Sequence, residues 1–499
     1  MIKENRKGIF MLHLRWVDIE KKGVKNLIVP VLEDREITDH QAIAGLVKQA
    51  RTIPEFKGEK GNELVLYQPG SLPVERVFFL GLGKYKTLDR EVLRAFAGKG
   101  IKKGIGMKLA EVMIEIPSPE RVRRDPEEIL EPLLEGAFLA NHLFSRYKQE
   151  KKERALEKIE FLAPPAMQRK FRDLPKSVET VCGATLLARE WVSMPSNEKK
   201  PEQFAKAVIG QAKKAGLKTT LLTEKVLRQK GFGSMLSVSA GSESQAQLVI
   251  LEHHPVKTGK PVVLVGKGVT FDSGGINLKP GTGMEEMKTD MSGAATVAAT
   301  LIAAARMGMK QNLVGVLPIV ENMPSGSATR PGDIVKSFSG KTVEILNTDA
   351  EGRLILIDAL AWAGKTYKPE IMIDLATLTG ACVVALGEKI AGLFTADNSL
   401  AKAIVESGER TFERCWRLPM PDDYKELLKS DLADIRNVAE SRWGGAIQGA
   451  LFLSEFVKDC RWAHIDIAGP ASAKKEGPYC GVGGTGFGVR LLCDALARL

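Results

Sequence analysis

The sequence has few of the side chains that build thiolate or histidine metal sites. It contains six cysteines and six histidines in 499 residues. The cysteines are scattered without a C-x-x-C pair, and the histidines form neither H-x-H nor H-E-x-x-H. These absences exclude a disulfide framework and a structural zinc ribbon, and they favour a reducing setting.

Long apolar runs are also missing. The longest stretch of small and apolar residues, AATVAATLIAAA, is well short of the ~20 residues that a membrane span needs. The opening stretch, MIKENRKGIFMLHLRW, is too interrupted by polar residues to predict a signal peptide. We therefore expect a cytoplasmic protein that does not enter the membrane.

Aromatic residues make up only 6% of the chain, whereas lysine and arginine (72) outnumber aspartate and glutamate (61), giving a formal net charge of +11. Such an excess permits binding to nucleic acid. However, the basic residues are spread along the chain, and few aromatics are present to stack on bases. The charge therefore favours a solvated basic surface over a nucleic-acid site.

The length predicts two domains rather than one core. In the first part, apolar runs such as NLIVPVL and RVFFLGLG alternate with amphipathic stretches such as REVLRAFAGKGIKKG, as in βαβ units. Charge and proline increase around residues 145–175, which is typical of a connector. We predict a smaller N-terminal α/β domain over 1–165, a helical linker over 166–190 and a larger C-terminal α/β domain over 191–499.

The second part contains strand-like runs that are apolar throughout, which predicts a mostly parallel central sheet covered by helices on both faces. These runs are QLVILE, PVVLVG, LVGVLPIV, TVEIL, IMIDLA and AHIDIAG. Ligands of such sheets bind beyond the carboxyl ends of the strands. Polar groups follow three of the runs: Lys267 and Asp272, then Asp349 and Glu351, then residues 377–380. We expect all three groups at one sheet edge.

Residues 265–293, VGKGVTFDSGGINLKPGTGMEEMKTDMSG, carry Lys267, Asp272, Lys279 and Asp290 in a glycine-rich stretch. Asp290 precedes a helix-like run, so it could simply cap that helix. The lysines could simply pair with the carboxylates. A buried lysine beside dications could instead lose its proton and bind metal as an amine.

A second stretch, NTDAEGRL over residues 347–354, carries Asp349, Glu351 and Arg353. Its two acids could simply interact favourably with the dipole of the helix that follows, without a role in catalysis. If these two acids meet Asp272 and Asp290, however, four carboxylates would repel strongly unless cations lay among them. Two divalent ions would balance the charge, and oxygen-rich ligation suits manganese, magnesium or zinc.

The motifs VGKGVTFDSGG, KTDMSG, NTDAEGRL and ATLTGA together resemble the leucyl aminopeptidases, the cytosol aminopeptidase family of two-metal exopeptidases. The resemblance covers the second part of the chain, and the first part fits the family's N-terminal domain by layout. It implies a metallo-aminopeptidase, a hydrolase that releases leucine-like N-terminal residues from peptides. It also implies a cytoplasmic homohexamer.

By the same resemblance, Asp272 and Glu351 would bridge two divalent ions, Mn²⁺ or Zn²⁺ with Mg²⁺ as an alternative. Lys267 and Asp290 would complete the tighter metal site, and Asp349 the more exchangeable one. Such a site activates water and polarises the scissile carbonyl.

The resemblance assigns the catalytic roles to Lys279 and Arg353. Lys279 would stabilise the oxyanion of the tetrahedral intermediate. Arg353 would anchor a bicarbonate that shuttles the proton. The apolar pocket for the first side chain would be lined by Met287, Thr377, Gly380 and Ala468.

Two other function classes remain open from the residues alone, a two-metal phosphoesterase and a basic nucleic-acid-binding protein. The first usually adds histidines or phosphate-gripping arginines, which are not evident here. GVGGTGFG, residues 481–488, contains G-x-G-x-x-G but lacks the strand and downstream acid of a dinucleotide site, so it predicts a tight turn into the last helix. We expect His464 in the core, and His253 and His254 at a strand end.

Overall fold

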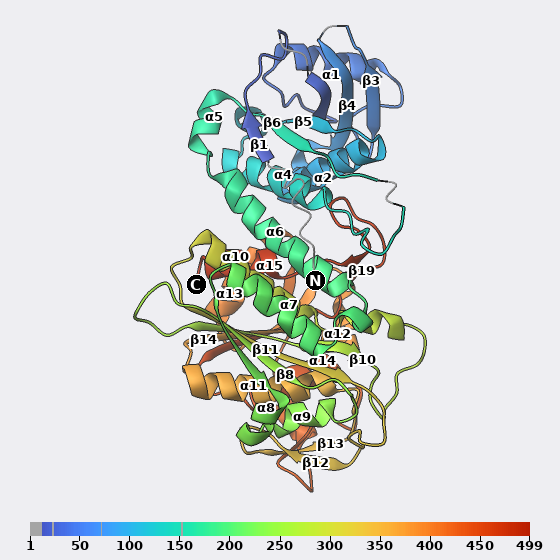
Figure 1. Ribbon diagram of the computed structural model, residues 1–499. Helices are drawn as coiled ribbons and strands as arrows, with labels where there is room; N and C mark the ends of the chain where they lie inside the picture. Colours follow the sequence, from blue (N-terminus) through green and yellow to red (C-terminus); the bar gives the residue numbers. More distant parts are fainter. Residues whose placement is uncertain (1–11, 22–23, 71, 151–152) are drawn as a thin grey trace. The chain divides into compact units, whose positions relative to one another are not determined.

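The computed structural model describes residues 12–21, 24–70, 72–150 and 153–499 (Figure 1). The chain forms two compact units. Unit 1 comprises Met1–Cys182 with Lys475–Gly481, and unit 2 comprises Gly183–Lys474 with Val482–Leu499. Residues 1–11, which carry most of the stretch read for a signal peptide, lie outside the described residues. The helices α5 (Pro165–Lys170) and α6 (Leu174–Ser193) occupy the predicted linker region, and the division between the units falls inside α6.

Unit 1 is built on a six-stranded sheet with the order β1-β6-β5-β2-β4-β3, in which only the β3–β4 pair is antiparallel. Its strands are β1 (Leu12–Arg15), β2 (Val24–Leu32), β3 (Glu63–Tyr67), β4 (Val74–Gly83), β5 (Glu111–Glu115) and β6 (Lys158–Leu162). Its helices include α1 (Gln41–Thr52), α2 (Arg90–Gly106), α3 (Pro119–Val122) and α4 (Pro126–Ala140). The predicted α/β alternation is confirmed.

Local sequence explains where the unit 1 helices begin. The Asp89 carboxylate accepts a hydrogen bond from the Val92 amide at 2.8 Å and caps α2. Asp125 caps α4 in the same way, and Pro126 occupies its first turn, where no amide donor is lost. Strand β2 is buried continuously over its last seven residues, because β4 and β5 pair with its two edges and helices cover the faces of the sheet.

Residues 475–481 come from far along the chain but pack within unit 1. The Tyr479 hydroxyl donates to Glu91 at 2.9 Å, and Lys102 donates to the carbonyl of Gly477 at 2.7 Å. Gly98 on α2 permits this packing, because a Cβ there would lie 2.6 Å from the Pro478 carbonyl oxygen. The segment is the tip of a hairpin whose strands are β19 (Ser472–Ala473) and β20 (Gly483–Gly484).

Unit 2 contains a nine-stranded sheet with the order β16-β15-β18-β14-β9-β11-β8-β7, and β10 pairs with β11. The strands are β7 (Lys218–Thr223), β8 (Gln247–His253), β9 (Val262–Gly266), β10 (Gly268–Asp272), β11 (Leu313–Asn322), β14 (Ile371–Ala376), β15 (Ala391–Phe394), β16 (Cys415–Arg417) and β18 (Arg461–Asp466). The central pairs β11–β9, β9–β14 and β14–β18 are all parallel, which confirms the predicted sheet type.

Helices cover both faces of this sheet. In Figure 1, α7 (Pro201–Lys214), α10 (Ser292–Met307) and α13 (Asn398–Thr411) lie on one face, and α8 (Glu224–Lys230), α9 (Gly233–Ser239) and α11 (Glu351–Tyr367) lie on the other. The remaining helices of unit 2 are α12 (Gly380–Leu386), α14 (Gly445–Ser454) and α15 (Val489–Leu496). No helix among the described residues is long and apolar enough to cross a membrane.

One strand lies outside the predicted sheet. TVEIL forms β13 (Thr342–Ile345), which belongs to a separate three-stranded sheet with β12 (Asp333–Lys336) and β17 (Ile435–Arg436). The prediction that it joins the central sheet is wrong. Its residues alternate between half-buried and buried, as in a strand with one covered face, whereas the central strands are buried throughout.

Three smaller predictions are confirmed. Residues 487–488 turn into α15, as expected, but over fewer residues than the predicted 481–488, because Gly483 and Gly484 form β20. His464 is fully buried within β18, and His253 is the last residue of β8. All six cysteines are free.

A buried acid lies at the end of β5. Glu115 is 1% exposed, one of its oxygens accepts from the Thr38 hydroxyl, and its Oε2 has no hydrogen-bond partner among the described residues. Burial raises the pKa of Glu115 from 4.5 to about 8.

This pKa makes a prediction about stability. The folded chain keeps the Glu115 proton to higher pH than the unfolded chain. Protonated Glu115 therefore contributes fully to the free energy of unfolding below about pH 4.5, and this contribution is lost as the pH rises through about 8. The loss is about 1.4 kcal/mol for each pH unit in this window. Glu115→Gln should therefore show a smaller fall in unfolding temperature than the wild type between about pH 5 and about pH 8, measured by scanning calorimetry. The exposed Glu55→Gln is the control, and parallel curves for all three proteins would contradict the assignment.

Candidate metal centre

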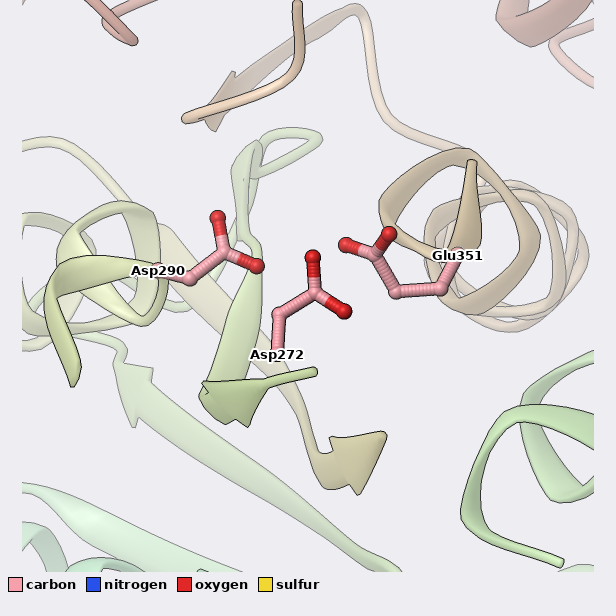
Figure 2. Close-up of side chains that lie close together, drawn as sticks. All are labelled: Asp272, Asp290 and Glu351. Atoms are coloured by element: carbon pink, nitrogen blue, oxygen red, sulfur yellow. The ribbon is translucent and has the colours of Figure 1, made fainter. Parts of the chain in front are cut away.

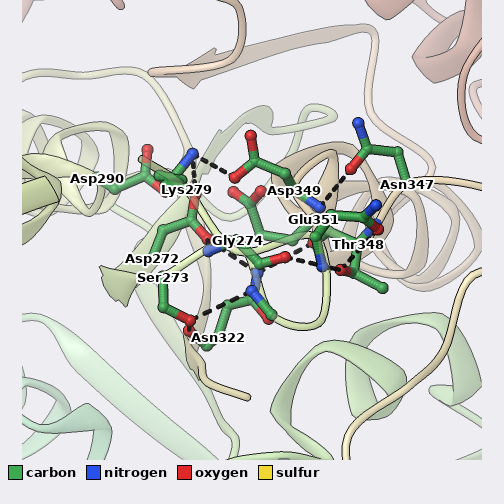
Figure 3. A network of polar contacts seen from close by, with 12 residues as sticks. Asp272, Ser273, Gly274, Lys279, Asp290, Asn322, Asn347, Thr348, Asp349 and Glu351 are labelled. Carbon is green, nitrogen blue, oxygen red and sulfur yellow. Dashed lines mark hydrogen bonds and ion pairs between the residues drawn. The ribbon is translucent and has the colours of Figure 1, made fainter. Parts of the chain in front are cut away.

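The turn that contains Asp349 and Glu351 is fixed by side chains of its own and of a neighbouring loop. The side-chain Oδ1 of Asn347 accepts from the Asp349 amide at 2.8 Å, as in an Asx turn. Thr348 is bonded through its amide to Asn277 Oδ1 at 2.8 Å, and its hydroxyl donates to the Gly274 carbonyl at 2.7 Å. Figure 3 shows this network, which ties the turn to the loop after β10.

Asp272, the last residue of β10, faces the same network and is 2% exposed. Its Oδ1 accepts from the Gly274 amide at 2.9 Å and from Asn322 Nδ2 at 2.8 Å. Gly274 has φ +87°, and a Cβ there would lie 2.8 Å from Asp349 Oδ1. The glycine is therefore needed both for the backbone conformation and for the close approach of Asp349.

Asp290 does not cap the helix that follows it. Helix α10 begins at Ser292 and has no side-chain cap. The Asp290 carboxylate instead lies 2.8 Å from Lys267 Nζ, and its Oδ1 accepts from the Thr377 hydroxyl at 2.6 Å. Its Oδ2 is buried and has no hydrogen-bond partner among the described residues. The capping alternative for Asp290 is thus not the one that the structure adopts.

Three carboxylates converge at this point. Oxygens of Asp272, Asp290 and Glu351 lie within 4.8 Å of one another, and all three residues are buried (Figure 2). Burial, together with repulsion from Glu351, raises the pKa of Asp272 above its ordinary value, and burial raises that of Asp290 far above it. The free Asp290 oxygen and the all-oxygen donor set fit a hard divalent cation.

Two lysines lie among these acids. Lys267 Nζ lies 2.7 Å from Glu351 Oε1, besides its contact with Asp290, and donates to the Thr377 carbonyl at 2.8 Å. Burial disfavours its ammonium, but the carboxylates outweigh burial and raise the pKa of Lys267 above its usual range. In this arrangement Lys267 is a cation that pairs with acids, so binding a metal as an amine requires it to lose that proton.

Lys279 has the same role on the other side of the cluster. Its Nζ is 2.8 Å from Asp272 Oδ2 and also pairs with Asp349. Burial opposes the charge, but Asp272 and Asp349 raise the pKa of Lys279 above its ordinary value. Burial also raises the pKa of Asp349. The structure therefore brings Lys267, Asp272, Lys279, Asp290, Asp349 and Glu351 into one cluster.

Arg353 lies in the first turn of α11 and differs from the two lysines. It is buried, its Nη1 donates to the Asn437 carbonyl at 2.7 Å, and its guanidinium lies 5.9 Å from the centre of the Phe452 ring. It forms no ion pair with a carboxylate in the described part of the chain, and burial lowers the pKa of Arg353 to about 10. A buried guanidinium without an acid is suited to holding an anion.

Asn437 is a residue that the sequence did not indicate. It is fully buried just after β17, its Oδ1 accepts from the Leu346 amide at 2.9 Å, and its Nδ2 donates to the Asn347 carbonyl at 2.7 Å. Its own carbonyl accepts from Arg353. Asn437 thus holds the turn that carries two of the acids, but no motif marks a lone asparagine about 90 residues away.

The predicted pocket residues follow neighbouring strands. Thr377 and Gly380 follow β14, and Ala468 follows β18, which is parallel to β14, so their loops share one sheet edge. Met287 is half-buried in the 3-10 turn over Met284–Thr289, and its carbonyl accepts from the Asp290 amide at 3.3 Å. Of these four, Thr377 donates to the Asp290 carboxylate, whereas Met287 is linked to Asp290 only through the backbone.

Comparisons with known proteins agree with this geometry. Residues 186–493 match the catalytic domain of the cytosol aminopeptidase family, and residues 28–151 match its N-terminal domain. The chain is 44% identical over 460 residues to a probable cytosol aminopeptidase of Geobacter sp. (strain M21), covering 92% of each chain. It is 42% identical over 491 residues to one of Syntrophotalea carbinolica, covering 95% of this chain and 96% of the relative.

Solved structures extend the likeness to the whole fold. A mutant of tomato leucine aminopeptidase aligns with a TM-score of 0.86 at 30% identity, covering 99% of this chain and 98% of that one. The bottromycin maturation enzyme BotP in complex with Mn aligns with a TM-score of 0.83 at 31% identity, covering 95% and 99%. Fold, acidic cluster and relatives define a metal-dependent aminopeptidase. The chain belongs to the cytosol aminopeptidase family.

The contacts of Asn437 make a prediction about activity. Asn437→Ala should lower kcat roughly 10- to 100-fold and raise the Mn²⁺ concentration needed for half-maximal activity, because the turn with Asp349 and Glu351 loses its support. The matched control is Asn312→Ala. Asn312 is a buried asparagine just before β11, and its Nδ2 donates to the carbonyls of Thr258 and Gly259. Equal losses of kcat in both variants would show that Asn437 acts only on overall stability.

Proposed function

We propose that this metallo-aminopeptidase releases leucine-like N-terminal residues from peptides and uses two divalent cations per subunit. The observation that carries the proposal is the buried cluster of Asp272, Asp290 and Glu351, in which Asp290 Oδ2 lacks a hydrogen-bond partner among the described residues. The likeness to tomato leucine aminopeptidase and to a manganese-bound relative supports it.

Five side chains would hold the metals. Lys267, Asp272, Asp290 and Glu351 would hold one ion, and Asp272, Asp349 and Glu351 would hold the other. Mn²⁺ or Zn²⁺ suits this donor set, with Mg²⁺ as an alternative. When bound, such ions lower the pKa of a water molecule and polarise the scissile carbonyl.

Lys279 would donate hydrogen bonds to the oxyanion that develops on the substrate. Its side chain is 20% exposed, compared with 3% for Lys267, so a substrate can reach it. Its contacts with Asp272 and Asp349 keep the ammonium aimed into the cluster. Lys279 would therefore be the protein side chain that stabilises the oxyanion, in addition to the metal ions.

Arg353 would hold bicarbonate, which accepts and returns the proton. One support is that Arg353 is buried without an ion pair among the described residues. A second is that the described acidic cluster contains no histidine that could accept the proton instead. The hydrogen bond to Asn437 and the Phe452 ring fix the guanidinium. With its pKa near 10, Arg353 remains charged at neutral pH.

Asp290 would also select for a free N-terminus. Asp290 and one of the metals would together hold the free α-amino group of the substrate. The first side chain would then enter a pocket lined by Met287, Thr377, Gly380 and Ala468. Internal peptide bonds lack this free amino group and would be excluded.

The first test is metal-dependent release of nitroaniline from leucine p-nitroanilide. Chelator should abolish release, and added Mn²⁺ should restore it. Lys279→Gln should lower kcat roughly 100- to 1,000-fold with little change in KM, because the lost interaction belongs to the transition state. The exposed Lys257→Gln is the control. Release that persists unchanged in chelator would refute the metal mechanism.

We also propose, from the family resemblance, that the chain is a cytoplasmic homohexamer. Light scattering of the active, manganese-loaded protein should give six times the 54.4 kDa of one chain. A mass of 54.4 kDa with full activity would contradict this assembly.

A further inference from the structure

We propose that Asp466 is a positioning residue that sets selectivity for the first side chain of the substrate. It does so by joining the two loops that follow β14 and β18. The inference rests on the proposed function, which assigns Thr377, Gly380 and Ala468 in these loops to the pocket. Asp466 itself would not contact the substrate.

Asp466 is the last residue of β18 and is fully buried. Its Oδ1 accepts from the Leu378 amide and from the Ala468 amide, each at 3.1 Å. Its Oδ2 accepts from the Thr379 hydroxyl at 2.7 Å. One carboxylate therefore receives donors from both loops.

A second connection runs through Thr379. Its hydroxyl oxygen accepts from the Cys382 amide at 3.1 Å and thereby caps α12, whose first residue is Gly380. The same hydroxyl gives its proton to Asp466. The start of α12, and with it one wall of the pocket, is thus placed by Asp466.

The loop also reaches the acidic cluster. Thr377 precedes Leu378, donates through its hydroxyl to Asp290 and accepts through its carbonyl from Lys267. A displacement of residues 377–380 would therefore move the pocket relative to Asp290, which would hold the substrate amine. Misplacement by about 1 Å at such a position is enough to alter rates strongly.

The chemistry of Asp466 favours positioning over packing. A fully buried carboxylate is unfavourable unless its oxygens are hydrogen-bonded, and an apolar side chain would fill the same space without that cost. Asp466 forms no ion pair within 4 Å in the described part of the chain, and its three donors all come from the two loops. What the carboxylate provides is the connection between them.

The test compares Asp466→Asn with Asp374→Asn. Asp374 is also fully buried, on the adjacent strand β14, but its oxygens contact Trp462 Nε1 at 2.8 Å and His464 Nδ1 at 2.6 Å rather than the loops. We expect Asp466→Asn to lower the leucine preference, which is kcat/KM for leucine p-nitroanilide divided by kcat/KM for alanine p-nitroanilide. The expected fall is roughly tenfold, within the range that pocket contacts supply. Asp374→Asn should leave that ratio within about twofold of the wild type, even where thermal stability falls.

A second pair of variants serves if Asp466→Asn folds poorly. Thr379→Val removes the hydroxyl and should lower the leucine preference in the same direction, whereas Thr379→Ser keeps the hydroxyl and should retain the preference. The double variant Asp466→Asn/Thr379→Val should lose little more than Asp466→Asn alone, because both changes break one connection.

The outcomes separate the two proposals. If the manganese-loaded wild type hydrolyses neither anilide, both the proposed function and this inference fail. If the wild type hydrolyses both, and Asp466→Asn and Thr379→Val keep the leucine preference or lose it no more than Asp374→Asn, the proposed function stands and the role of Asp466 is overturned.

Discussion

Repulsion among buried carboxylates is the constraint on which the catalytic unit depends. Asp272, Asp290 and Glu351 come from three separate segments, yet their oxygens lie within 4.8 Å of one another. Such an arrangement is unfavourable unless cations compensate it. Lys267 lies between Asp290 and Glu351, and Lys279 lies between Asp272 and Asp349, so the chain supplies part of the compensating charge itself.

Hydrogen bonds to backbone groups keep these charged side chains in place. Asn322 binds the Asp272 carboxylate and the Thr348 carbonyl, and Asn437 binds the turn that leads to Glu351. Neutral amides can satisfy both donors and acceptors without adding charge. Asn322 and Asn437 thus support the turn that carries Asp349 and Glu351 without adding charge next to the acids.

The sequence predicted the α/β class and the meeting of the acids, because continuous apolar strands and acids after them are local patterns. It misplaced β13, whose half-buried residues belong to a small second sheet. The acids still converge, because α11 begins at Glu351 and directs that side chain inward from a turn held by Thr348. Asn437 could not be predicted, since its role depends on contacts across about 90 residues of chain.

The hairpin over residues 472–484 limits how modular the protein can be. Its two strands belong to unit 2 and its tip to unit 1, so the chain passes from one unit to the other three times. A cut within α6 would leave Pro478 and Tyr479 without the surface of α2 that Gly98 and Glu91 provide. The amino-terminal unit is consequently an integral part of the enzyme and not an appendage that one deletion removes cleanly.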